Sequence, residues 1–139
     1  MIDFHYECEF SIPNKEQYAD WLTQIVASEN SSCGPLEYIF CDDEYLLKIN
    51  QEYLDHDTYT DIITFQYSEG SSISGDIFIS VERVRENAKE YGVDFDQELL
   101  RVMAHGVLHL LGYKDKSEQE AALMREKENE KIKLFHVEH

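Results

Sequence analysis

Apolar and polar side chains alternate at the start of the chain. From residue 2 to residue 10 the even positions carry Ile, Phe, Tyr, Cys and Phe, and the odd positions carry Asp, His and Glu. A period of two is typical of a half-buried strand, so we expect a strand over residues 2–10. Runs rich in β-branched and aromatic residues predict three more strands, at 36–41, 62–65 and 73–80.

Five helices are predicted between and after these strands. Ser80 and Gly92 bound one of them, and Ser117 with Glu120 forms a capping box at the start of the last. The order βαβαββααα predicts a single α+β domain over residues 1–139, with a mixed four-stranded sheet packed with about five helices. The expected helices cover residues 14–29, 43–54, 81–91, 94–111 and a segment that follows Ser117.

The composition indicates a soluble protein of the cytoplasm. Hydrophobic residues make up 42% and charged residues 29%, which is ordinary for a globular chain. The N-terminus lacks the apolar core of a signal peptide, and no apolar run reaches the roughly 20 residues of a membrane span. Three cysteines, an odd number without a C-x-x-C pair, indicate reduced thiols. We therefore expect a cytoplasmic location and no membrane association.

Acidic residues outnumber basic ones, but unevenly along the chain. The net charge is -17; residues 1–80 hold two basic and sixteen acidic side chains, and residues 81–139 hold ten basic and thirteen acidic. A strongly acidic chain repels nucleic acid at long range, so DNA is not an expected partner. Any polyanion has to approach through the second half of the chain or through a bound cation.

Residues 103–116 contain a pattern that predicts a metal site. His105 and His109 lie four apart on one predicted helix, which places both on the same face. Gly112 ends the helix and lets the chain turn back, so that Asp115 can reach the same ion. Two histidines and one carboxylate leave a fourth position for water, as a catalytic zinc ion requires. Ordinary core helices also contain such histidine pairs, and the glycine and aspartate favour the metal site.

This spacing is that of the metzincin proteases, with one difference. Those enzymes have a glutamate directly after the first histidine, which takes and returns a proton. Here that position is Gly106, so the predicted helix is metzincin-like in its ligands but a zinc metalloprotease is disfavoured. Phosphodiester cleavage remains compatible, because a metal polarises the phosphoryl oxygen and water or an RNA 2′-OH can attack.

Four blocks of the sequence resemble the YbeY family of bacterial endoribonucleases. HGVLHLLGYKD (105–115) resembles its signature H-G-x-L-H-L-x-G-Y-D-H, and YTDIITF (59–65) resembles its strand T-D-V-L-S-F. GDIFIS (75–80) resembles L-G-D-I-x-I-S, and INQEY (49–53) resembles L-N-x-x-Y-R. The resemblance implies a single-strand-specific, metal-dependent endoribonuclease with one zinc ion per chain. It also implies a role in 16S rRNA 3′-end maturation and ribosome quality control, with rRNA and the small subunit or its proteins as partners.

Two positions depart from the family's pattern. The family's third ligand is histidine, whereas this chain has Asp115, preceded by Lys114 where the family has aspartate. Aspartate is a harder zinc ligand, so Mn²⁺ or Mg²⁺ is also a candidate. His136 and His139 are rival third ligands. Leu54 replaces an arginine that would stabilise phosphate charge.

Five further residues are candidates for supporting roles. Lys114 and Lys116 flank Asp115, and Arg101 lies one turn before the first histidine, so all three are candidate RNA contacts or simply solvated surface charges. Asp61 and Asp76 are candidates for carboxylates that orient a ligating histidine, or for turn and strand-end residues.

Three functions therefore compete. The first is a metal-dependent endoribonuclease acting on rRNA, whose catalytic water is held by the metal at His105, His109 and Asp115. The second is a ribosome-assembly binding factor with a structural or vestigial metal site, which Leu54 and Asp115 favour. The third is the zinc metalloprotease, against which Gly106 argues.

Overall fold

The computed structural model of this chain describes residues 1–54, 60–68 and 70–136. All nine predicted elements are found within them, in the predicted order. They are β1 (Ile2–Tyr6), α1 (Lys15–Ser28), β2 (Ser32–Cys41), α2 (Asp43–Leu54), β3 (Ile62–Gln66), β4 (Ser72–Ser80), α3 (Val81–Tyr91), α4 (Phe95–Leu110) and α5 (Glu118–Phe135).

The four strands form one mixed sheet in the order β1-β2-β4-β3. β1 and β4 pair with β2 in parallel, and β3 pairs with β4 in the antiparallel direction. The antiparallel pair follows from the short connection between β3 and β4, because parallel neighbours need a crossover of a dozen or more residues. The predicted α+β fold with a mixed four-stranded sheet is confirmed.

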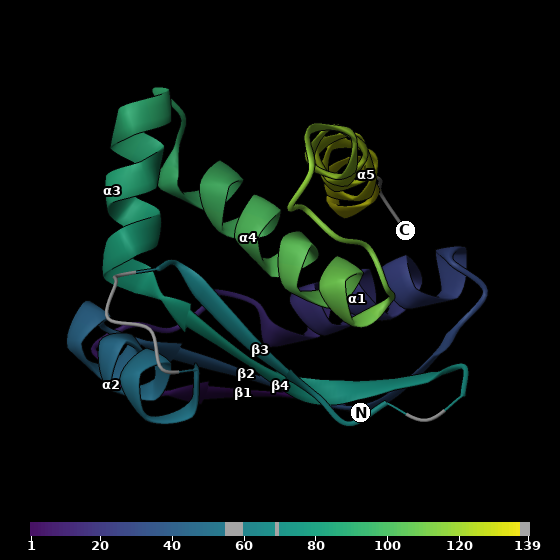
Figure 1. The fold of residues 1–139 in the computed structure, drawn as a ribbon, viewed down its shortest axis with the longest axis horizontal. Coiled ribbons are helices and arrows are strands. Elements are labelled where there is room, and N and C mark those ends of the chain that lie inside the picture. The colour runs from purple at the N-terminus through teal and green to yellow at the C-terminus, as the bar shows by residue number, and fades with distance from the viewer. Residues whose placement is uncertain (55–59, 69, 137–139) are drawn as a thin grey trace.

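The helices divide unequally between the two faces of the sheet (Figure 1). α1, α4 and α5 gather on one face, where a large core includes Trp21, Tyr38, Ile77 and Met103. α2 contributes Leu46 to a smaller separate core on the other face. α4 runs across the sheet against β3 and β4 and beneath α5, so it is the most enclosed helix on its face. A helix held on two sides is a rigid support for a site.

The first strand is shorter than its side-chain pattern predicts. β1 ends at Tyr6 rather than at residue 10, although residues 7–10 continue the exposed and half-buried alternation. Tyr6 pairs with Phe40, and β2 ends one residue later at Cys41. The prediction was wrong at this end because periodicity reports burial, whereas a strand also needs a partner for its backbone.

The second strand is longer than predicted, since it begins at Ser32 inside the stretch NSSCGP that we expected to be a loop. Ser32 and Cys33 pair with the start of β4, and the register then shifts between Cys33 and Leu36. Pro35 in that gap has no N–H to donate to a ladder, which explains the irregularity. Gly and Pro here mark a bulge within a strand rather than its beginning.

The predicted helix caps are confirmed. The Ser80 hydroxyl accepts from the backbone N–H of Arg83, and Gly92 ends α3 with a φ of +66°. Ser117 and Glu120 form the reciprocal capping box of α5. All three cysteines are free thiols. Within the described residues, no helix combines the length and the apolar character needed to cross a membrane.

Candidate metal centre

The two predicted histidine ligands lie side by side on α4. Most residues of this helix from Leu99 to Leu110 are buried, whereas His105 and His109 are partly exposed on one side of it. Their ring centroids are 4.6 Å apart. The four-residue spacing therefore presents two imidazoles together from a helix that is fixed by its packing.

Gly112 ends α4 and turns the chain back toward the histidines. Its φ of +106° lies in the region that favours glycine. The N–H of Gly112 donates to the carbonyl of His109 at 3.0 Å. The N–H of Tyr113 donates to the carbonyl of Leu108, also at 3.0 Å, which completes a Schellman cap. This cap directs the next residues, including Asp115, toward the exposed side of the helix.

Asp115 meets both histidines. Its Oδ2 lies 3.1 Å from Nε2 of His105 and 3.5 Å from Nε2 of His109. Ligands at about 2.0–2.1 Å around a tetrahedral zinc ion are separated by about 3.3 Å, so these atoms lie near the edges of such a polyhedron. The three candidate ligand atoms all fall within 4.8 Å of one another. The structure brings the three predicted ligands together, and the donor set fits a divalent metal.

The two histidines differ in their electrostatic surroundings. Burial lowers the pKa of His109, and the neighbouring His105 lowers it further. Burial also acts to lower the pKa of His105, but the carboxylates of Glu128 and Asp115 outweigh burial and raise this pKa. Metal ions bind neutral histidine, so the surroundings of His109 favour its ligating form.

Glu128 of α5 contacts His105 directly and was missed by the sequence analysis. It is buried, and its Oε2 accepts a hydrogen bond from Nδ1 of His105 at 2.6 Å. A signal was present in the sequence, because Met124, Glu128 and Ile132 are four residues apart and the two apolar members are buried. A carboxylate in line with an apolar stripe is a sign of a buried partner.

The side chain of Arg101 is not free at the surface to bind RNA. Its guanidinium donates to Oε1 of Glu128 at 3.0 Å and to Oδ1 of Asn129 at 2.8 Å. Only 17% of its side chain is exposed. Arg101 and His105 line the same cavity, and the charge of Arg101 is already paired there by a carboxylate of α5.

Asp61 and Asp76, the two candidates for orienting a histidine or for turn and strand-end roles, line different cavities. Asp61 lines a cavity of about 300 Å³ together with His105 and Glu128, and it accepts from the side-chain amide of Asn87 at 3.2 Å. Burial raises the pKa of Asp61. Asp76 instead lines a pocket on the α2 side, where it accepts from the Tyr67 hydroxyl. The structure therefore brings Asp61, but not Asp76, to the cavity that His105 lines.

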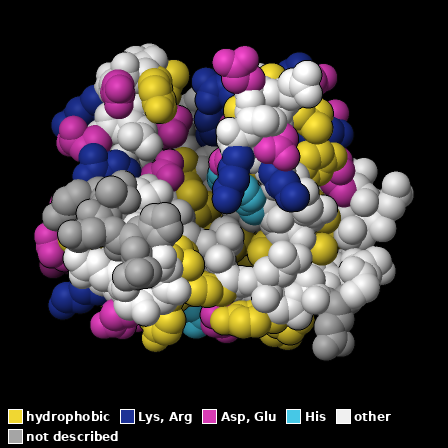
Figure 2. Space-filling view, viewed as in Figure 1, with side chains coloured by type: hydrophobic (Ala, Val, Ile, Leu, Met, Phe, Trp, Pro, Cys, Tyr) yellow, Lys and Arg dark blue, Asp and Glu magenta, His cyan; other side chains and the backbone are white. Residues whose placement is uncertain are grey.

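Lys114 and Lys116 are exposed on either side of Asp115. Figure 2 shows a hollow in the centre of this face, with His side chains inside it and Lys or Arg side chains at its rim.

Gly106 is fixed by close packing of α4 on the sheet. A Cβ at this position would lie 2.9 Å from side-chain atoms of both Ile62 and Ile77. The glutamate of the metzincin motif therefore has no room here. Packing thus supports the interpretation of the sequence, which disfavoured a protease because Gly106 lacks a side chain.

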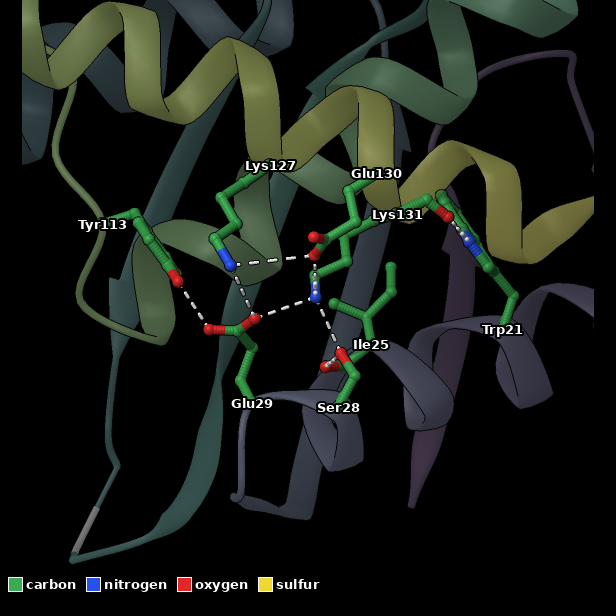
Figure 3. Close-up of polar contacts among 8 residues, drawn as sticks. All are labelled: Trp21, Ile25, Ser28, Glu29, Tyr113, Lys127, Glu130 and Lys131. Carbon is green, nitrogen blue, oxygen red and sulfur yellow. Dashed lines mark hydrogen bonds and ion pairs between the residues drawn. The ribbon is translucent and has the colours of Figure 1, made fainter.

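The turn that carries Asp115 is anchored to the body of the protein through Tyr113 (Figure 3). The Tyr113 hydroxyl donates to Glu29 at the end of α1, at 2.5 Å. Glu29 also forms ion pairs with the ammonium groups of Lys127 and Lys131 of α5, at 3.4 and 2.8 Å. One carboxylate therefore joins α1, α5 and the turn between α4 and α5.

A family described as Endoribonuclease YbeY matches residues 4–136 of the chain. The chain belongs to the YbeY family. An Endoribonuclease YbeY of Flavobacterium johnsoniae is 61% identical over 138 residues, which cover 99% of both chains. Another from Bacteroides thetaiotaomicron is 45% identical and covers 86% of this chain and 88% of its own. The family resemblance predicted from the motifs is confirmed.

A solved structure is also similar to this one. The solution structure of TM1509 from Thermotoga maritima has a TM-score of 0.67 and 27% sequence identity, and the match covers 97% of this chain and 89% of that one. The likeness therefore extends over the whole sheet and the helices around it.

Two departures from the YbeY signature have structural counterparts. Asp115, which stands where the signature has histidine, lies close enough to both histidines to serve as the third ligand. Leu54, which stands where the signature has arginine, is exposed at the end of α2. Of the rival ligands, His136 is exposed at the end of α5 and does not belong to the cluster of His105, His109 and Asp115. His139 lies outside the described residues.

Proposed function

We propose that this chain is a metal-dependent endoribonuclease that cleaves single-stranded RNA during 16S rRNA 3′-end maturation and ribosome quality control. The observation that carries the proposal is the cluster of His105, His109 and Asp115, of which His105 and Asp115 line a cavity of about 300 Å³. Membership of a family described as endoribonucleases supports the reaction class. Its partners are rRNA and the small ribosomal subunit or its proteins, in the cytoplasm.

One zinc ion would be held by Nε2 of His105, Nε2 of His109 and a carboxylate oxygen of Asp115. Such an ion supplies a Lewis acid for the phosphoryl oxygen and lowers the pKa of water. Three protein ligands leave a position for substrate or water, as catalytic sites do. The carboxylate is a hard ligand, so Mn²⁺ or Mg²⁺ is an alternative occupant of the same residues.

The chain's own residues bind and orient the RNA. Lys114 and Lys116 place positive charge next to Asp115, where phosphates of a strand crossing the hollow would lie. The side chain of Asp61 lines the adjoining cavity and presents a carboxylate, which accepts hydrogen bonds from base edges. Gly106 provides no proton-transfer group, so attack does not depend on the glutamate that metzincins use.

The test is cleavage of a single-stranded RNA oligonucleotide under single-turnover conditions. Wild type is compared with His109→Ala, and Lys133→Ala on the exposed surface of α5 serves as the matched control. We expect cleavage by wild type and by the control, and its loss in His109→Ala. Equal cleavage by His109→Ala and wild type in contaminant-free preparations would contradict the proposed centre.

A ribosome-assembly binding factor is the second candidate. The observation that favours it is Leu54, an exposed apolar residue where the family signature has a cation for phosphate. In this case the wild-type protein binds single-stranded rRNA or small-subunit particles and leaves the RNA intact with zinc, Mn²⁺ or Mg²⁺ supplied.

A further inference from the structure

A buried ion pair lies directly behind His105. Glu128 has only 6% of its side chain exposed and uses both carboxylate oxygens, one toward the histidine and one toward Arg101. Neither residue belongs to the three proposed metal ligands. Burying a charged pair is costly unless its geometry is well satisfied, so its position against a ligand needs a reason.

We propose that Arg101 and Glu128 form a positioning unit that fixes the orientation and tautomer of His105. The proposal rests on the proposed function, because it assumes that Nε2 of His105 ligates the metal. Nε2 faces Asp115 at 3.1 Å, whereas Nδ1 lies 2.6 Å from Oε2 of Glu128. A carboxylate accepts only from a protonated nitrogen, so Glu128 keeps the proton on Nδ1 and leaves the lone pair of Nε2 for the ion.

Arg101 holds this carboxylate in place. Its guanidinium contacts Glu128 at 3.0 Å and the neighbouring Asn129 at 2.8 Å, so two of its nitrogens bind consecutive residues of α5. Arg101 and His105 are four residues apart on α4 and so present their side chains together. The carboxylate of Glu128 thus joins two successive turns of α4, and the ring of His105 has a fixed partner before any ligand arrives.

The first test is zinc affinity, measured on the full-length protein by competition with a chromophoric chelator. In Glu128→Gln an amide of the same shape replaces the carboxylate, and we expect zinc binding about 10- to 100-fold weaker than in wild type. Glu126→Gln makes the same charge change at an exposed position of α5 and is expected to bind zinc as wild type does. Circular dichroism of each variant checks that it is folded.

The outcomes separate this inference from the proposed function. If wild type binds zinc and Glu128→Gln binds it equally tightly, the positioning role is overturned and the metal centre stands. If wild type itself binds no zinc, Mn²⁺ or Mg²⁺, both are overturned. Weaker binding in Glu128→Gln but not in Glu126→Gln supports the positioning role.

A second measurement needs no variant and decides the matter if Glu128→Gln fails to fold. Two-bond ¹H–¹⁵N correlation spectra of zinc-loaded wild type report which nitrogen of His105 carries a proton. We expect a proton on Nδ1 and none on Nε2. A zinc form in which Nδ1 is the ligating nitrogen would overturn the inference whatever the variants do.

Discussion

Replacing Lys131 by methionine is expected to lower the melting temperature by about 10 °C. The Lys131 side chain is only 2% exposed, and its ammonium contacts Ser28, Glu29 and Glu130 at 2.8 Å each (Figure 3). Methionine keeps the length and apolar contacts of the stem and removes the charge. Glu29, whose side chain is 16% exposed, then loses its nearest cation.

The magnitude follows from the partners that remain. Removing one member of a buried ion pair costs about 3–5 kcal/mol. Glu29 keeps the Tyr113 hydroxyl at 2.5 Å and the Lys127 ammonium at 3.4 Å, so we expect the lower end, about 3 kcal/mol. An unfolding entropy of about 2.1 cal/mol/K per residue gives about 0.3 kcal/mol/K for this chain, hence the shift of about 10 °C.

Thermal and urea unfolding monitored by circular dichroism measure the effect. Lys133→Met removes the same charge from an exposed position of α5 and is expected to change stability by less than about 0.5 kcal/mol. In a double-mutant cycle, Glu29→Gln and Lys131→Met together should cost less than the sum of the two, because each removes the other's partner. Two results would contradict this reasoning. Lys131→Met could lower the free energy of unfolding no more than Lys133→Met does, or the effects of Glu29→Gln and Lys131→Met on that free energy could be simply additive. In either case the contact between Lys131 and Glu29 would not stabilise the fold.

Three further predictions concern pH, packing and metal. Burial tends to raise the pKa of Glu29, but hydrogen bonds from Lys131 and Tyr113 lower it below 4.5. Its stabilisation is therefore present above pH 4.5 and lost as the pH falls through the folded-state pKa, so acid unfolding followed by fluorescence should be steeper in wild type than in Glu29→Gln. Gly106→Ala should destabilise the protein by about 1–3 kcal/mol in urea unfolding, because its methyl group meets isoleucines of β3 and β4, and a gain in stability would contradict that packing. Zinc at about 100 times its dissociation constant should stabilise wild type by about 2.7 kcal/mol, an effect reversed by chelator. Asp115→Ala should show little of this stabilisation, and an equal gain would remove Asp115 from the ligand set.

The site residues that lie close together along the chain could be predicted from the sequence alone. His105, His109, Gly112 and Asp115 lie within eleven residues, and helical geometry with one glycine turn is enough to bring them together. Glu128 could not be placed in this way, because its contact with His105 depends on how α5 packs on α4 across 23 residues of sequence.

The same limit applies to α5 as a whole. Most of its charged side chains are exposed, yet Glu128 and Lys131 are buried and contact different partners. The spacing of charges along one helix can indicate that one of them is buried, as for Glu128 in line with Met124 and Ile132, but it does not reveal which residue of another helix that charge contacts. The start of β2 was missed for the same reason, because its first residues are defined by pairing with β4.

The two buried charges of α5 explain why this helix is not simply apolar on its inner side. Glu128 reaches His105 on α4, and Lys131 reaches Glu29, which also holds the turn before Asp115 through Tyr113. An apolar pair would stabilise the helix packing as well as an ion pair does, and often better. It would not, however, fix the direction of a histidine ring or of a tyrosine hydroxyl. The polar contacts of α5 therefore hold His105 directly and the turn that carries Asp115 through Glu29 and Tyr113, and stability and metal affinity should respond separately to their removal.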